Sequence, residues 1–162
     1  MTKYSLPIGC LASLLLVGCG HISDSALEQM FRSHKAQIEE LRTMVVADAE
    51  TKAIYKYVVR TDHGYSESEH QGLSQERWNQ YQTLLHGIGI DAVGSGGTKI
   101  WFRVEIRGES EKGLVYSDVS PTPILKSLDD FSPSESTRTT DHGDYRGYKN
   151  LEGNWYLWAG YY

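Results

Sequence analysis

Ile100-Trp101-Phe102-Arg103-Val104-Glu105-Ile106-Arg107 is the stretch that decides the fold of this chain. Apolar side chains at every second position, from Ile100 to Ile106, alternate with Trp101 and charged residues. A period of two is typical of a strand with one buried face. A polar segment follows at 108–113, and 114–117 has the composition of a returning strand. The stretch therefore predicts an antiparallel hairpin.

Two amphipathic helices are predicted before this hairpin. Ser25 and Glu28 have the spacing of a capping box, and apolar residues at helical spacing then continue to about Val46. Ser74 is in position to cap the second helix. The apolar side of that helix is formed by Trp78, Tyr81, Leu84 or Leu85, and Ile88.

Further strands are expected at 53–60 and 155–158, where Tyr, Val and Trp are frequent. The glycines of 91–97 indicate a flexible turn, and the Ser, Thr, Asp and Pro of 129–144 indicate a long mobile loop. The order of elements predicts an α+β fold. We expect a single domain, residues 25–162, in which an antiparallel sheet of about four strands carries the N-terminal amphipathic helix and the second helix on one face.

The N-terminal segment is typical of a secretory signal. Lys3 gives a short positive region, and an apolar region extends to Val17. Leu16-Val17-Gly18-Cys19 resembles a lipobox, which implies cleavage after residue 18 and lipid on Cys19. Residues 19–24 would form a lipidated start and short tether, and the acyl chains would hold the protein on a membrane. By the convention for such proteins, Gly20 favours the outer membrane, facing the periplasm.

The composition narrows the range of partners. The chain has 16 Lys and Arg against 21 Asp and Glu, a formal net charge of −5. Loss of the leader, with Lys3, leaves 15 against 21, or −6. This balance and the lack of a basic stripe argue against nucleic acid. Both cysteines lie within residues 1–19, so we expect no disulfide and no thiolate metal site in the domain. We also expect no cofactor.

Three segments of the C-terminal half carry a resemblance. They are Lys112-Gly113-Leu114-Val115-Tyr116-Ser117, Ser127-Leu128-Asp129 and Leu151-Glu152-Gly153-Asn154-Trp155-Tyr156-Leu157. Together with the lipobox and Tyr145-Arg146, they resemble a group of small uncharacterised bacterial lipoproteins. The chain departs from that pattern at Leu114, where an aromatic residue is usual, and at Trp158, where tyrosine is usual. The group has no established activity, so the resemblance implies a fold and a location only.

A repeated Thr-Asp-His-Gly phrase is the candidate for metal chemistry. It occurs at 61–64 and at 140–143, and it places imidazoles beside carboxylates on predicted loops. His63, His70, Asp141 and His142 offer ligands of the kind that divalent ions take in a hydrolase. The competing interpretation is that Asp and Gly simply form turns, and no zinc-type spacing is present. We favour the turns and expect no metal.

The aromatic C-terminus is the candidate for partner binding. In a strand, Tyr156 and Trp158 share the face opposite Trp155 and Leu157, and Trp101 can join them from the neighbouring strand. An exposed aromatic face would mark a binding surface for a protein partner. The alternative, slightly favoured, is that residues 129–144 or the chain's own tail cover these rings.

These observations favour a lipid-anchored protein of the cell envelope with a binding or structural role over an enzyme. A second hypothesis is an immunity lipoprotein that neutralises a toxin delivered to the periplasm; its small size, tether and acidic charge fit that role. A third is a metal-dependent envelope hydrolase that uses the two His-containing loops.

Overall fold

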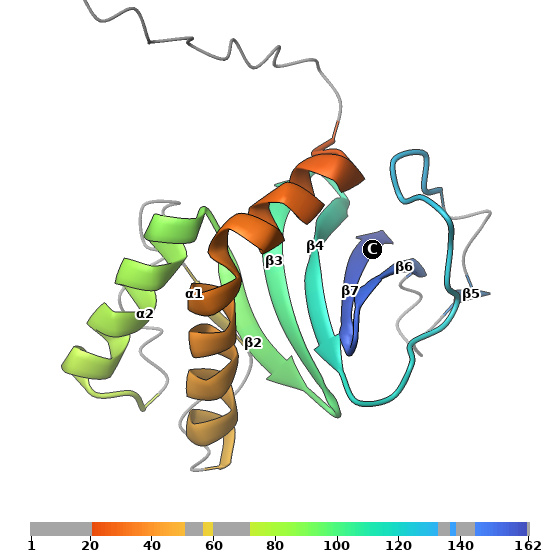
Figure 1. Cartoon of the computed structure of the whole chain (residues 1–162). Helices are drawn as coiled ribbons and strands as arrows, with labels where there is room; N and C mark the ends of the chain where they lie inside the picture. The colour runs from red at the N-terminus through yellow and green to blue at the C-terminus, as the bar shows by residue number, and fades with distance from the viewer. Residues whose placement is uncertain (1–20, 51–56, 60–71, 133–136, 139–144, 162) are drawn as a thin grey trace, which may run out of the picture.

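The computed structural model describes residues 21–50, 57–59, 72–132, 137–138 and 145–161, and these form an α+β domain (Figure 1). One seven-stranded sheet has the order β1-β2-β3-β4-β7-β6-β5, and each pair of neighbouring strands is antiparallel. The elements are α1 (Asp24–Glu50), β1 (Tyr57–Val59), α2 (Gln75–Ile88), β2 (Ala92–Gly96), β3 (Lys99–Arg107), β4 (Ser110–Ser117), β5 (Thr137–Arg138), β6 (Tyr145–Glu152) and β7 (Trp155–Tyr161).

The sheet has more strands than the sequence predicts. The segment 91–97, expected to be a turn, contains β2, and the expected loop 129–144 contains β5. The glycines of this segment indicate a turn because glycine has low strand propensity. In the structure β2 nevertheless pairs with β3 along its whole length, from Ala92 to Gly96.

The start of α1 also differs from the prediction. Ser23, rather than Ser25, caps the helix: its Oγ accepts a hydrogen bond of 3.2 Å from Ala26 N. The Ser23 carbonyl accepts the first helical bond from Leu27 N at 3.1 Å. Ser23 and Ser25 are equally able to cap a helix. The tertiary contacts of Asp24 with Leu128 and Asp129 fix the start of the helix at Ser23.

The second helix forms as predicted. Ser74 Oγ accepts a hydrogen bond from Arg77 N at 3.2 Å, and Gly89 ends the helix in the left-handed region, at φ 82°. The buried side of α2 is Trp78, Tyr81, Leu85 and Ile88. Asp48 of α1 accepts hydrogen bonds from Arg77 Nε at 2.8 Å and from the Tyr81 hydroxyl at 2.7 Å, which joins the two helices.

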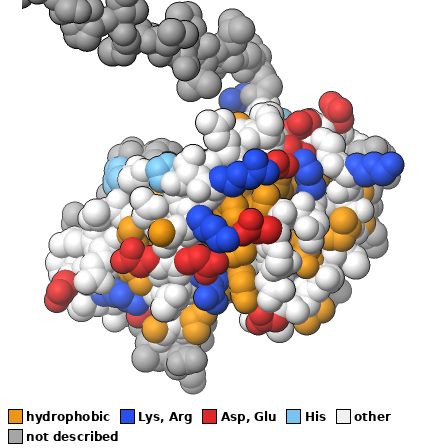
Figure 2. All heavy atoms as spheres, in the orientation of Figure 1, with side chains coloured by type: hydrophobic (Ala, Val, Ile, Leu, Met, Phe, Trp, Pro, Cys, Tyr) orange, Lys and Arg blue, Asp and Glu red, His pale blue; other side chains and the backbone are white. Residues whose placement is uncertain are grey.

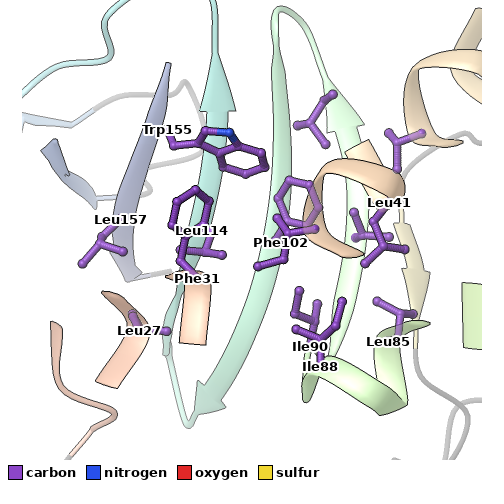
Figure 3. Close-up of a cluster of buried hydrophobic side chains, with 14 of the residues drawn as sticks. Leu27, Phe31, Leu41, Leu85, Ile88, Ile90, Phe102, Leu114, Trp155 and Leu157 are labelled. Carbon is purple, nitrogen blue, oxygen red and sulfur yellow. The ribbon is translucent and has the colours of Figure 1, made fainter. Parts of the chain in front are cut away.

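The main core lies between the helices and one face of the sheet. α1 crosses the sheet and α2 lies beside it (Figure 1). Phe31 of α1 packs against Trp155 of β7, and Phe102 of β3 packs against the same indole, each with ring centroids 5.2 Å apart (Figure 3). The fully buried aliphatic residues of this core are Leu27, Ile38, Leu41, Val45, Leu85, Ile90, Val93, Leu114 and Leu157. One face of each central strand is thus committed to the helices.

Candidate functional site

The first feature with functional weight is the start of the described chain, which is fixed to one end of the domain. Ile22 N donates to Glu105 Oε2 at 2.8 Å, and the Ile22 carbonyl accepts from Lys112 Nζ at 3.0 Å. His21 lies between β3 and β4: its Nδ1 is 3.3 Å from Glu105 and its Nε2 is 3.2 Å from Ser110 Oγ. The backbone and side chains therefore hold this segment at several points.

A buried ionic cluster continues this attachment. Asp24 is 2% exposed, and its Oδ1 lies 2.9 Å from Lys112 Nζ. Its Oδ2 accepts from Leu128 N at 2.8 Å, and its own N donates to Asp129 Oδ1 at 2.6 Å. Burial alone would raise the pKa of Asp24, but the hydrogen bond from Leu128 and the charge of Lys112 outweigh it and lower the pKa.

These contacts shorten the predicted tether. Residues 19–24 are expected to link the lipid to the domain, whereas the structure describes His21 to Asp24 in contact with β3, β4 and the 127–129 segment. Only Cys19 and Gly20 then remain between the predicted lipid and the first fixed residue.

The second feature is a groove at the other end of the domain, which we call the α1 groove. It has a volume of about 540 Å³ and lies between the last turns of α1 and the β2–β3 turn. Its lining residues are Arg42, Val45, Val46, Ala49, Ser95, Gly97, Thr98, Lys99, Ile100, Tyr116 and Asp118. Val46 is 40% exposed, so an apolar side chain faces solvent here.

One wall of the α1 groove is held by a chain of polar contacts. The Trp155 indole donates to Glu39 Oε1 at 2.8 Å, and Arg42 Nε donates to Glu39 Oε2 at 2.7 Å. The Arg42 guanidinium lies over the Tyr116 ring, 4.6 Å from its centroid. The Tyr116 hydroxyl in turn donates to Asp118 Oδ1 at 3.0 Å. Core packing of Trp155 thus fixes the position of the cation.

The geometry leaves the tip of Arg42 available for a ligand. Nε is used by Glu39, and within the described ranges neither terminal nitrogen has a hydrogen-bond acceptor. A guanidinium can bind a carboxylate through two parallel N–H bonds. The α1 groove therefore combines an apolar surface, at Val46 and Ala49, with a donor for an anionic group.

The predicted partner-binding residues Trp101, Tyr156 and Trp158 lie on the opposite face of the sheet and come together as expected. They form a second cluster with Val115 and Tyr148. The three rings are 6%, 4% and 3% exposed, so the structure favours the alternative in which this face is covered. A role in partner binding stays a prediction that nothing here tests.

Two cations, Lys99 and Arg146, account for part of this burial. Lys99 Nζ lies 5.4 Å from the Trp101 ring and 4.9 Å from the Tyr148 ring, and Arg146 lies 4.8 Å above Trp101. Burial, and then the charge of Arg146, lower the pKa of Lys99. Gly113 stands opposite Trp158 across the β4–β7 pair, where a side chain would meet the backbone of β3.

The residues proposed for metal chemistry, His63, His70, Asp141 and His142, lie outside the described residues. Within the described ranges, no group of three or more His, Cys, Asp and Glu side chains is arranged to hold a metal ion. On the face in Figure 2, acidic and basic side chains are interspersed.

Comparison with known proteins gives no relative: no family model, no curated protein and no solved structure matches the chain. Among the helices of the described residues, none has the length and apolar character to cross a membrane.

The α1 groove is the site that sequence reasoning missed. It is built from α1, β2, β3 and β4, and no local pattern brings these segments together. One weak signal exists: Val45 and Val46 are adjacent, and neighbouring positions of a helix point to different sides. Only one of the two can enter the main core.

Proposed function

We propose that this chain is a lipid-anchored protein of the bacterial cell envelope that binds a protein partner in the α1 groove. The observation that carries the binding role is the Arg42 guanidinium, held by Glu39 and Tyr116 beside the exposed Val46. A partner segment with a carboxylate next to an apolar side chain complements this surface in charge and in polarity.

The anchor is supported by the lipobox at 16–19 and by the start of the fold just beyond it. Two or more acyl chains hold a protein on a bilayer stably, since each buried CH₂ contributes about 0.8 kcal/mol. The outer membrane, facing the periplasm, is the location that Gly20 favours.

The anchor is tested in the native host by metabolic labelling with palmitate and by membrane fractionation. The unaltered chain should take up label and sediment with the outer membrane, and Cys19→Ala should lose both properties. A soluble, unlabelled native product would contradict the anchor.

The groove is tested by photo-crosslinking in intact cells. A photoreactive amino acid at Val46 should give a discrete adduct with one envelope protein, whereas the same probe at Arg32, exposed near the other end of α1, should not. Arg42→Ala should weaken the adduct more than Arg42→Lys, because lysine keeps the charge but lacks the paired N–H donors. Equal adducts from Val46 and Arg32, or an adduct unaffected by Arg42→Ala, would contradict a specific site.

A further inference from the structure

The fixed start of the chain and the α1 groove lie at opposite ends of the same strand. Glu105, near the end of β3, binds Ile22, and Thr98, just before β3, lines the groove. At about 3.3 Å per residue, the nine residues of β3 separate these ends by about 26 Å. α1 runs opposite to β3 in chain order and spans the same two ends, from Asp24 beside Lys112 to the groove (Figure 1).

The lipid attachment point is close to the first of these ends. An extended chain spans at most about 3.3–3.6 Å per residue. The step from Cys19 to His21 therefore covers no more than about 7 Å. This is comparable with the depth of the headgroup layer on one side of the membrane, about 5–7.5 Å, since a bilayer of about 40–45 Å has a hydrocarbon core of about 30 Å.

We propose that the domain rests on the lipid headgroups in one orientation, through the end that carries His21 and the β3–β4 turn. It is not connected to its lipid by a flexible linker. This rests on the proposed lipidation of Cys19. The contacts of Ile22 with Glu105 and Lys112 transmit the restraint, because they fix the backbone next to the anchor to two strands of the sheet.

The side chains at this end suit a headgroup layer. Ile106 is 46% exposed and Arg107 is 42% exposed in its side chain, so an apolar group and a cation stand together beside the turn. Acidic groups share this end: Glu105, whose Oε1 lies 2.7 Å from Arg107 Nε, together with Glu109 and Asp129. The surface is mixed in charge, and acyl chains, rather than basic residues, supply the attraction to the bilayer.

The orientation has a consequence for binding. With this end on the bilayer, the α1 groove opens at the far pole, about 26 Å further from the headgroups along β3. A partner in the aqueous compartment can then reach Val46 and Arg42 without meeting lipid. A freely swinging domain would present the groove to the membrane and to the compartment alike.

The test uses the lipidated full chain in phospholipid vesicles with a headgroup-attached quencher. Cys19 is consumed by lipid and Cys10 leaves with the leader, so one introduced cysteine can be labelled alone. A fluorophore at Glu109→Cys, in the β3–β4 turn, should be quenched several-fold more strongly than one at Thr98→Cys, at the groove. Both positions are exposed.

A linker variant provides the matched control. About sixteen Gly and Ser residues inserted between Gly20 and His21 have a root-mean-square reach of about 22 Å, which should remove most of the difference between the two probes. Glu105→Ala, which takes away the acceptor for Ile22 N, should reduce the difference in the same direction.

The outcomes separate the two proposals. Equal quenching of both probes in the lipidated, unaltered chain, or stronger quenching at Thr98, overturns the fixed orientation and leaves the anchor intact. A linker variant that keeps the full difference overturns it as well. A native chain that mass spectrometry finds without acyl groups overturns the proposed anchor, and the orientation with it.

Discussion

Lys112 Nζ lies 2.9 Å from Asp24 Oδ1, and each side chain is only 3% exposed. The pair joins the first residue of α1 to the middle strand β4, under the 127–129 segment. A buried ion pair adds little net stability, but the loss of one partner leaves an uncompensated charge in the interior. The pair therefore specifies where the helix starts and where the chain before it must lie.

Lys112→Met tests this arrangement. It leaves the Asp24 carboxylate buried with only Lys149 as a cation, 3.3 Å away. We expect the free energy of unfolding to fall by about 3–5 kcal/mol, as measured by urea denaturation. Lys126→Ala, on the exposed part of the same region, should change it by less than about 0.5 kcal/mol. Equal effects of the two substitutions would show that the pair is not a structural constraint.

The pH dependence of stability follows from the lowered pKa of Asp24. The folded state binds a proton at this carboxyl more weakly than the unfolded state does. Its stabilising contribution is therefore present above the ordinary aspartate pKa of about 3.9 and is lost as pH falls through the lower folded value. Unfolding experiments should show the difference between the unaltered chain and Asp24→Asn shrinking below about pH 4. A difference that stays constant with pH would contradict the shift.

The aromatic cluster should contribute to stability directly. The rings of Trp101 and Trp158 meet edge to face, with centroids 5.1 Å apart and planes at 79°. Trp158→Ala should lower the free energy of unfolding by about 3–5 kcal/mol. A double-mutant cycle with leucine at both positions should give a coupling of about 0.5–1.5 kcal/mol. If substitution of Trp101 and Trp158 left the free energy of unfolding unchanged, the rings would not stabilise the fold, and a role in binding a partner would remain.

Two glycines should respond to alanine with opposite signs. At Gly113 the added Cβ would lie 2.0 Å from the Phe102 carbonyl oxygen, so the backbone of two strands must move apart. At Gly87, in α2, nothing lies within 4 Å. We expect Gly113→Ala to lower the melting temperature, at a cost of at least about 1–3 kcal/mol, and Gly87→Ala to raise it through about 1 kcal/mol of helix propensity. Calorimetry on both variants measures the contrast.

The elements with strong local periodicity could be predicted from sequence. The alternation at 100–107 gave β3, and Ser74 with its apolar stripe gave α2, because each pattern depends only on residues within one element. The faces of β7 also followed, since side chains of a strand alternate. The metal-ligand candidates at 63–70 and 141–142 lie outside the described residues and stay predictions.

Elements that depend on distant partners were missed. The sequence of β2 is typical of a turn because its glycines have low strand propensity, yet the segment pairs with β3 in the sheet. The α1 groove was missed because it also depends on residues that are distant in sequence. Arg42 is held by Glu39 of the same helix, by Tyr116, and through Glu39 by the indole of Trp155. Helical spacing relates only Glu39 and Arg42.

The sequence by itself determined the fold class, the two sheet faces and the predicted site of lipid attachment. Each of these depends on a periodicity or a short motif formed by residues close together in the sequence. Only the tertiary structure decided that Ile22 and Asp24 are bound to Glu105 and Lys112, more than eighty residues away. Such contacts combine charge with burial, and burial is a property of the assembled domain. They fix the position of the chain immediately after the proposed lipid attachment site.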